Sequence, residues 1–243
     1  MKSYKNISGE YYEEAHGKNA PKAQAFMYTS REKYFHEFMQ LKGNERILDV
    51  GCGSGTFTRE IARKLPKARI VGADISKAVI GFASETTKKE GLKNLTFVVS
   101  GIESIKAKGK FDVIIVSHLI EHLKNPLQAL REVKKKLNKN GALFITTPNY
   151  ISLWPLAEIV FDKAMAKKGY SLEEQHISRF DYWSIRRIIQ KAGFEIQEEK
   201  TLYVFSLQAS IFSTKLGNAF FAADKALDKL PFGMIIYLKA TKK

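Results

Sequence analysis

The sequence predicts one α/β domain with a doubly wound, mostly parallel sheet and helices on both of its faces. Short apolar runs alternate along the chain with segments of helical periodicity. Val113–Val116 is apolar without alternation, as expected for a strand that is covered on both sides. The chain has 243 residues, of which 44% are hydrophobic, enough to fill one substantial core.

The predicted elements follow one another in a regular order until Pro148, where the alternation changes. The first strands are expected at Arg46–Val50, Arg69–Asp74, Leu95–Ser100, Phe111–Ser117 and Leu143–Thr147. Helices are expected between them at Thr56–Leu65, Lys77–Glu90 and Pro126–Leu137, with a turn at Asn140-Gly141 before the fifth strand. Further helices are expected at Ile151–Lys168 and Tyr182–Ala192, and further strands at Phe194–Tyr203 and Met234–Thr241.

A glycine-rich turn lies between the first predicted strand and its helix. Gly51, Gly53 and Gly55 occupy alternate positions, where glycine permits positive φ and a close approach of the backbone to a ligand. The helix that begins near Thr56 presents unpaired N–H groups to the same place. This segment therefore predicts a ligand-binding turn.

Asp49 indicates what kind of ligand this is. A carboxylate just before the turn suits a cationic amine better than a pyrophosphate. The dinucleotide fingerprint G-x-G-x-x-G, started at Gly51, fails because Thr56 occupies its last position.

The run Ile47-Leu-Asp-Val-Gly-Cys-Gly-Ser-Gly55 resembles motif I of the class I methyltransferases that use S-adenosylmethionine. The resemblance implies a seven-stranded, Rossmann-like sheet with an antiparallel last strand. It also implies that Gly51, Cys52, Gly53 and Gly55 surround the methionine part of the cofactor and that Asp49 faces its amino group. We expect a single methyltransferase domain over 1–243. It would comprise a helical N-terminal cover (1–44), a cofactor-binding core (45–150) and acceptor-side insertions with the last two strands (151–243).

The ends of the second and third strands offer further cofactor contacts. Asp74 is placed to accept hydrogen bonds from both ribose hydroxyls, or alternatively to cap the next helix, a role that Ser76 could take. The resemblance places Ile75 beside the adenine. At the adenine edge the family commonly has Asp, whereas this chain has Ser100-Gly101. The backbone N–H of Ile102 is then the expected contact, with Ser100 or Glu103 as substitutes.

The fourth strand ends in Ser117-His-Leu-Ile-Glu-His-Leu123, where an open α/β sheet binds its ligands. Ser117 and His118 are expected to border the cofactor. In a helical turn His118, Glu121 and His122 would share one face. His118 or His122 could be the general base, the trio could hold a divalent metal, or the three side chains could only pack. The Glu-His pair resembles the quinone-biosynthesis O-methyltransferases.

Two later segments point to the acceptor. Thr146-Thr-Pro-Asn149 resembles the end of the fifth strand in many small-molecule and glycan methyltransferases, so Asn149 could reach the acceptor pocket. His176 begins a His-x-x-x-Phe segment that folds over the acceptor in related enzymes. It is therefore the second candidate base, with a purely structural role as the alternative. Asp181 is the expected N-cap of the next helix.

Composition and charge limit the partners. The formal net charge is +15, but lysines outnumber arginines and are scattered, which favours a solvated surface over a nucleic-acid interface. Apolar residues also repeat at helical spacing from Phe212 to Leu230, beside an exposed-looking Trp154. Both could contact a membrane, although packing on the sheet or lining an acceptor tunnel is the favoured interpretation. No signal peptide or run of about 18 apolar residues is visible, which predicts a cytoplasmic protein.

The function predicted is methyl transfer from S-adenosylmethionine to a small-molecule, lipid-like or glycan acceptor. Oxygen is the expected acceptor atom, and direct displacement assisted by a histidine base is the expected mechanism. A divalent metal is not required by this mechanism. Two alternatives stay open: a nicotinamide-dependent oxidoreductase, and a methyltransferase-like binding protein without turnover.

Overall fold

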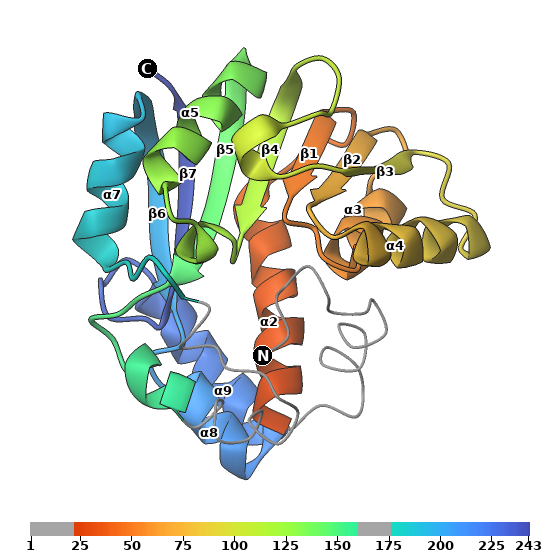
Figure 1. The fold of residues 1–243 in the computed structure, drawn as a ribbon. Helices are drawn as coiled ribbons and strands as arrows, with labels where there is room; N and C mark the ends of the chain where they lie inside the picture. Colours follow the sequence, from red (N-terminus) through yellow and green to blue (C-terminus); the bar gives the residue numbers. More distant parts are fainter. Residues whose placement is uncertain (1–21, 160–175) are drawn as a thin grey trace.

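The chain forms a seven-stranded sheet flanked by helices (Figure 1). The computed structural model describes residues 22–159 and 176–243; expectations that fall on residues 1–21 and 160–175 lie outside this range. The strands are β1 (Arg46–Val50), β2 (Arg69–Asp74), β3 (Leu95–Val99), β4 (Phe111–Ser117), β5 (Leu137–Pro148), β6 (Phe194–Leu202) and β7 (Ile235–Lys242). Among the described residues, no helix is long and apolar enough to cross a membrane.

The order of the strands is β3-β2-β1-β4-β5-β7-β6. Strands β1 to β5 pair in parallel, whereas β7 is antiparallel to both β5 and β6. The predicted doubly wound sheet with an antiparallel last strand is confirmed.

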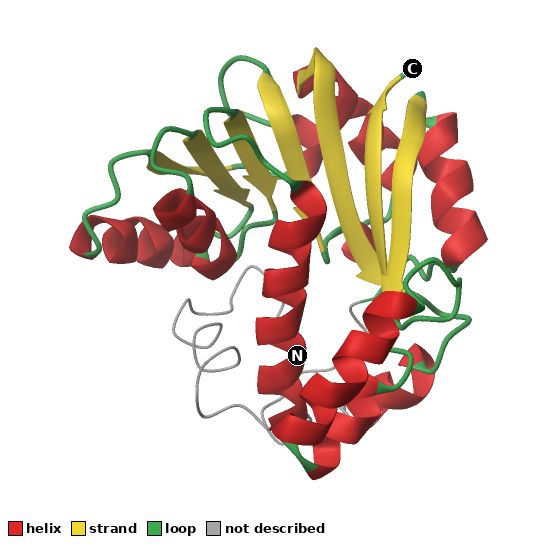
Figure 2. Ribbon diagram, turned by 180° about the vertical axis from the view of Figure 1, so that it is seen from behind, coloured by secondary structure: helices red, strands yellow, loops and turns green. Residues whose placement is uncertain are grey.

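Helices cover both faces of the sheet, as Figure 2 shows from behind. They are α2 (Lys22–Met39), α3 (Thr56–Lys64), α4 (Lys77–Lys89), α5 (Pro126–Lys136), α7 (Tyr182–Lys191), α8 (Ser206–Phe212) and α9 (Thr214–Ala226). Neighbouring residues of β1 belong to different cores: Leu48 packs with α5 and α7, and Ile47 packs with α2 and α3. This period of two explains why the central strands are apolar throughout.

Helix α2 is the described part of the expected N-terminal cover. Its aromatic side chains contact strand residues through edge-on ring pairs, among them Phe35 with Phe144 and Tyr34 with Tyr237. Phe35 and Tyr34 are buried, so core packing accounts for them.

Two expectations about strand β5 and the segment after it are wrong. Strand β5 begins at Leu137, and Asn140-Gly141 lies inside it, where the pairing with β4 shifts register, so there is no separate turn. Trp154 is only 4% exposed, because it faces inward from a helical stretch that is described over 154–159.

The apolar repeat from Phe212 to Leu230 does not pack on the sheet as a whole. Phe212 is 80% exposed, and Leu216 and Phe220 on α9 are exposed as well. Helix α9 instead turns Gly217 toward α8 and α2, where a Cβ atom would lie 2.7 Å from the Cβ atom of Ser210. That close approach leaves the neighbouring apolar stripe of α9 in solvent.

Candidate cofactor and acceptor site

The glycine turn after β1 has a backbone that only glycine adopts without strain. Gly51, Gly53 and Gly55 have φ values of 77°, 54° and 75°. A Cβ atom on Gly51 would lie 2.9 Å from Leu119 Cδ2, and one on Gly55 would lie 2.5 Å from Phe97 Cζ. Gly55 is also the N-cap of α3, so the turn brings the N–H groups of that helix to the carboxyl edge of the sheet.

Asp74, at the end of β2, closes this turn. Its carboxylate accepts hydrogen bonds from the N–H groups of Gly53 (3.1 Å) and Ser76 (2.9 Å). Burial raises the pKa of Asp74, while these N–H groups oppose the rise. Ser76 caps α4 by accepting from the N–H of Val79 at 3.3 Å, so the alternative in which Asp74 is the cap is wrong.

An apolar surface stands beside this carboxylate. Ile75 is 49% exposed although it is large and apolar. Its Cδ1 atom would lie 3.7 Å from a Cβ atom on Gly101. The side chain of Ile102 is buried, so this residue offers its backbone. Ile75 and Gly101 thus form a wall of the kind that a flat aromatic base packs against.

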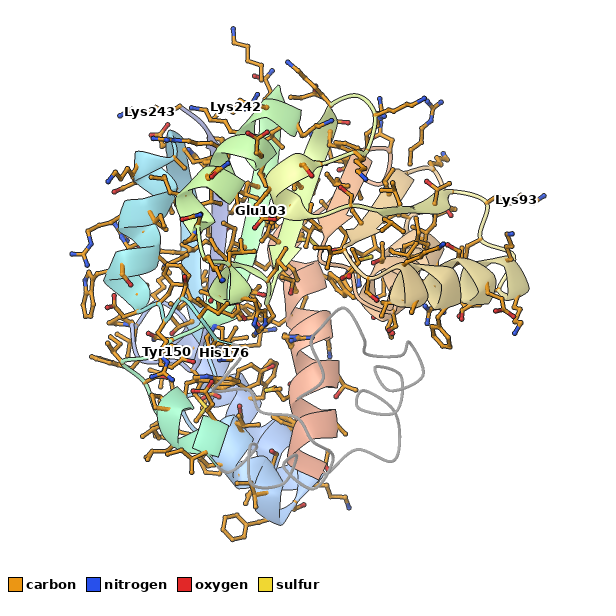
Figure 3. All side chains as sticks on the ribbon, viewed as in Figure 1. Lys93, Glu103, Tyr150, His176, Lys242 and Lys243 are labelled. Atoms are coloured by element: carbon orange, nitrogen blue, oxygen red, sulfur yellow. The ribbon has the colours of Figure 1, made fainter. Side chains whose placement is uncertain are left out.

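The substitutes suggested for the adenine edge have other roles or are exposed. Ser100 is buried, accepts from the N–H of Lys106 at 2.9 Å and donates to the carbonyls of Gly101 and Ser104. It therefore stabilises the turn after β3. Glu103 is exposed (Figure 3).

Asp49 lies on β1 just before the turn, and Cys52 is part of the turn. Thr58 donates a hydrogen bond to Asp49 at 2.6 Å. Burial nevertheless raises the pKa of Asp49 to about 6, and nearby Asp74 contributes to the rise. Burial also raises the pKa of the Cys52 thiol, an effect that Asp49 and Asp74 strengthen, so this thiol is a poor nucleophile.

His118 follows β4 in a left-handed conformation, with a φ of 48°. Its N–H donates to the Thr146 carbonyl at 3.0 Å, and the neighbouring hydroxyl of Ser117 contacts that of Thr146 at 2.9 Å. His118 Nδ1 lies 3.3 Å from Glu121 Oε1. Within the described residues, its buried Nε2 has no hydrogen-bond partner. The end of β4 therefore positions an imidazole nitrogen whose hydrogen-bonding capacity is not used by the described residues.

Burial and nearby charges determine the protonation states of His118 and Glu121. Burial, followed by the Arg31 charge, lowers the pKa of His118 to about 4, which outweighs the opposing effect of Glu121. Burial alone would raise the pKa of Glu121, but His118 above all, with His122 and His176, brings it down to about 2. At neutral pH the pair is a neutral imidazole beside a carboxylate. In the tautomer with a proton on Nδ1, Nε2 is a hydrogen-bond acceptor.

His176 enters the site from a segment distant in the sequence. Ser178 ties this segment to the end of β4, since its N–H donates to the Glu121 carbonyl at 2.8 Å and its hydroxyl to the Leu123 carbonyl at 2.7 Å. The rings of His122 and His176 have centroids 5.0 Å apart. The candidate bases His118, His122 and His176 thus surround one residue, Glu121.

A buried network holds His176. Its Nδ1 contacts the carboxylate of Glu158, and the Tyr150 hydroxyl lies 2.8 Å from the same nitrogen (Figure 3). Tyr150 also donates to both oxygens of Glu158, at 2.8 and 3.0 Å. His176 is 6% exposed and Glu158 4%. Neither Glu158 nor Tyr150 was predicted, because their partner lies far away in the sequence.

The residues that could hold a metal differ from the expected set. Glu121, His122 and His176 each offer a ligand atom, and these atoms lie within 4.8 Å of one another. His118 is not in this group, although the sequence placed it there with Glu121 and His122. The shared helical face does not form, because His118 has a positive φ and the 3₁₀ turn begins only at Ile120.

Asn149 supports a neighbouring loop. Its side-chain N–H₂ group donates to the carbonyls of Pro231 and Gly233, both at 2.8 Å. It is fully buried, so it does not reach into an open pocket as suggested.

The sheet order, the glycine turn and the carboxylate at the end of β2 define an α/β protein that binds a nucleoside cofactor at the carboxyl edge. Residues 41–207 match the family model of a methyltransferase domain. The chain belongs to the family of class I S-adenosylmethionine-dependent methyltransferases.

The proteins similar to this chain include both O-methyltransferases and N-methyltransferases. The chain is 31% identical over 192 residues to a ubiquinone biosynthesis O-methyltransferase of Coxiella burnetii, a match that covers 74% of this chain and 80% of that protein. It is 33% identical over 109 residues to (S)-coclaurine N-methyltransferase of Thalictrum flavum, covering 45% and 30%. Against several curated relatives the chain spans less than half of their length.

A solved structure shows the same fold. It is a SAM-dependent methyltransferase from Aquifex aeolicus with a TM-score of 0.63 and 19% identity, and the match covers 96% of this chain and 98% of that one.

Proposed function

We propose that this enzyme transfers the methyl group of S-adenosylmethionine to an oxygen atom of a small-molecule acceptor, with His118 as the base. The observation that carries this proposal is the neutral His118, whose Nε2 has no hydrogen-bond partner within residues 22–159 and 176–243 and whose ring lies beside the ionised Glu121. The O-methyltransferase among the relatives supports an oxygen acceptor. A lipid-like or glycan acceptor is compatible with the same chemistry.

The cofactor residues fit a bound S-adenosylmethionine. Gly51, Cys52, Gly53 and Gly55 would surround its methionine part, and Asp49 would face the amino group. Asp74 would hold the ribose, Ile75 with the backbone of Gly101 and Ile102 would hold the adenine, and Ser117 would border the site. The large apolar side chain of Ile75, 49% exposed beside Asp74, supports this assignment. When bound, the cofactor would supply a methyl group on a sulfonium, and the neutral thioether S-adenosylhomocysteine would leave as the acceptor oxygen bonds to that methyl group.

The side chains supply proton transfer and orientation. As the oxygen–methyl bond forms, the hydroxyl proton passes to His118 Nε2, and the carboxylate of Glu121, whose Oε1 lies 3.3 Å from Nδ1, stabilises the imidazolium. A base with a pKa near 4 is weak. It therefore suits an acidic hydroxyl, such as a phenol or an enol, better than an aliphatic alcohol.

The cluster of Glu121, His122 and His176 favours a second mechanism, in which a metal ion positions the acceptor. Two imidazoles and a carboxylate can hold a divalent metal, which would orient an acceptor with two neighbouring oxygens. Glu158 and Tyr150 would then fix the ring of His176 through Nδ1.

Calorimetric titration with S-adenosylmethionine, S-adenosylhomocysteine and NADH tests the cofactor. Asp74→Ala should abolish binding of the first two. A preference for NADH would favour the oxidoreductase alternative.

Label transfer from methyl-labelled S-adenosylmethionine to catechols, simple phenols and amines then tests the acceptor, with magnesium or with EDTA. His118→Asn should lower kcat at least about a hundredfold at unchanged cofactor affinity, whereas His36→Asn on α2 is the matched control. Turnover with amines alone would refute the oxygen acceptor. Full turnover in His118→Asn would exclude this base.

A further inference from the structure

One end of the molecule carries an unusual number of exposed apolar side chains, which we call the apolar end face. The segments involved are residues 150–159, α8, α9 and the loop to β7; they lie together beyond the edge at which the parallel strands end (Figures 1 and 2). Its side chains are each between 41% and 80% exposed: Ile151, Leu153, Leu156, Ile159, Phe205, Ile211, Phe212, Leu216, Phe220, Leu230 and Phe232. Monomeric soluble proteins rarely group this much apolar surface without a partner.

The charged side chains that these segments expose are all lysines. Within residues 150–159 and 203–234 every acidic side chain is buried: Glu158, Asp224 and Asp228. Asp224 caps α8 through the N–H groups of Phe205 and Ser206, which explains its place inside. Lys215 and Lys229 are exposed among the apolar residues, while Lys225 is exposed but pairs with Glu37 of α2. The face is therefore apolar and cationic, which complements a surface of anionic headgroups over acyl chains.

Residues 150–159 join this face to the acceptor site. On the inner side of the segment Tyr150 and Glu158 hold His176. On its outer side Leu156 is 63% exposed and Ile159 is 50% exposed. One short segment thus separates the candidate bases from the apolar end face, so a partner that covers this face lies next to the acceptor site.

We propose that the apolar end face docks on an anionic membrane surface, with Phe212 and Phe220 inserted at the level of the headgroups. The commitment to lipid rests on the combination of exposed aromatic and aliphatic side chains, interspersed lysines and the absence of exposed carboxylates in these segments. Docking does not depend on the identity of the methyl acceptor. It would bring a lipid-dissolved acceptor to the site, a consequence that rests on the proposed function.

Co-sedimentation of the full chain with vesicles tests this proposal. Vesicles of phosphatidylcholine with 30% phosphatidylglycerol, about one lipid in three, are compared with vesicles of phosphatidylcholine alone. The full chain should bind the anionic vesicles and leave them at high salt. Phe212→Ser with Phe220→Ser should weaken binding at least about tenfold. Lys215→Gln with Lys229→Gln should weaken it roughly 25-fold, or about fivefold for each lysine.

Matched controls lie elsewhere on the surface. Trp183→Ser removes a side chain that is 50% exposed on α7, and Lys93 stands at the far edge of the sheet (Figure 3). Trp183→Ser, and Lys67→Gln with Lys93→Gln, should bind as the unaltered chain does.

Three results would overturn the proposal: equal binding by the phenylalanine variant, equal loss in the controls, or a dimer that dissociates in the phenylalanine variant. The last result would mean that a second copy covers the face. S-adenosylhomocysteine affinity, measured on every variant, separates a failure of docking from a failure of the proposed function.

Discussion

The Asp49→Asn substitution should remove a pH dependence that is built into the cofactor turn. Burial raises the pKa of Asp49 from 3.8 to about 6, although Thr58 opposes the shift. Two units correspond to about 3 kcal/mol of unfolding free energy. Because the folded pKa lies above the unfolded one, the folded chain keeps a proton that the unfolded chain releases between about pH 4 and 6. This contribution is present at low pH and is lost as the pH rises through about 6.

Urea denaturation followed by circular dichroism measures the effect. Between pH 4.5 and 7.5 the unfolding free energy of the unaltered chain should fall by about 2 kcal/mol relative to Asp49→Asn. Asp181→Asn, which retains a side chain able to cap α7, controls for a general effect of replacing a carboxylate. A difference between the unaltered chain and Asp49→Asn that stays constant across this range refutes the assignment of the shift to Asp49.

Cofactor affinity should depend on the ionisation of Asp49 with a pH trend opposite to that of the unfolding free energy. A cationic amino group beside Asp49 favours the ionised carboxylate, so S-adenosylhomocysteine should bind more tightly as the pH rises through about 6. Asp49→Asn should bind weakly at every pH in calorimetric titrations. Affinity in the unaltered chain that falls over this range would place the amino group elsewhere.

Three further changes test the site. Gly55→Ala should destabilise the fold by about 1–3 kcal/mol, because the new Cβ meets the Phe97 ring at 2.5 Å. Thermal denaturation measures the loss, and Gly91→Ala is the control, since Gly91 has a φ of +68° but open space around it. Equal losses of stability in the two variants would rule out the clash. Asp74→Asn should weaken S-adenosylhomocysteine binding roughly ten- to a hundredfold in calorimetry, and an unchanged Kd would remove Asp74 from the ribose site. Glu158→Gln should lower kcat about tenfold at unchanged cofactor Kd, because the substitution releases His176. An unaltered kcat would mean that the contact between Glu158 and His176 only stabilises the structure.

The local parts of the fold and of the cofactor site were predictable from the sequence. Strand β1, the glycine turn and Asp74 lie within thirty residues of each other, and their chemistry depends on residue type at short spacing. The confirmed antiparallel β7 came from the family resemblance, since apolar patterning does not give strand direction.

The acceptor side could not be predicted in the same way. His176 meets Glu158 and Tyr150 only because the chain folds back past β4, and no spacing in the sequence encodes that contact. The positive φ of His118 depends on its surroundings, since such a φ is uncommon outside glycine even in histidine, one of the residue types enriched there. The sequence therefore could not show that His118 lies outside the 3₁₀ turn and outside the group of possible metal ligands.

The position of β7 has a consequence for the order in which the molecule forms. In the described sheet β6 is hydrogen-bonded to β7 alone, and β7 separates it from β5. During synthesis β6 emerges first but has no strand to pair with until β7 has followed. The parallel half with the cofactor turn can assemble earlier from β1 to β5, which are contiguous. A newborn chain would thus pass through a stage in which its cofactor half is complete and its outer strand is still unpaired.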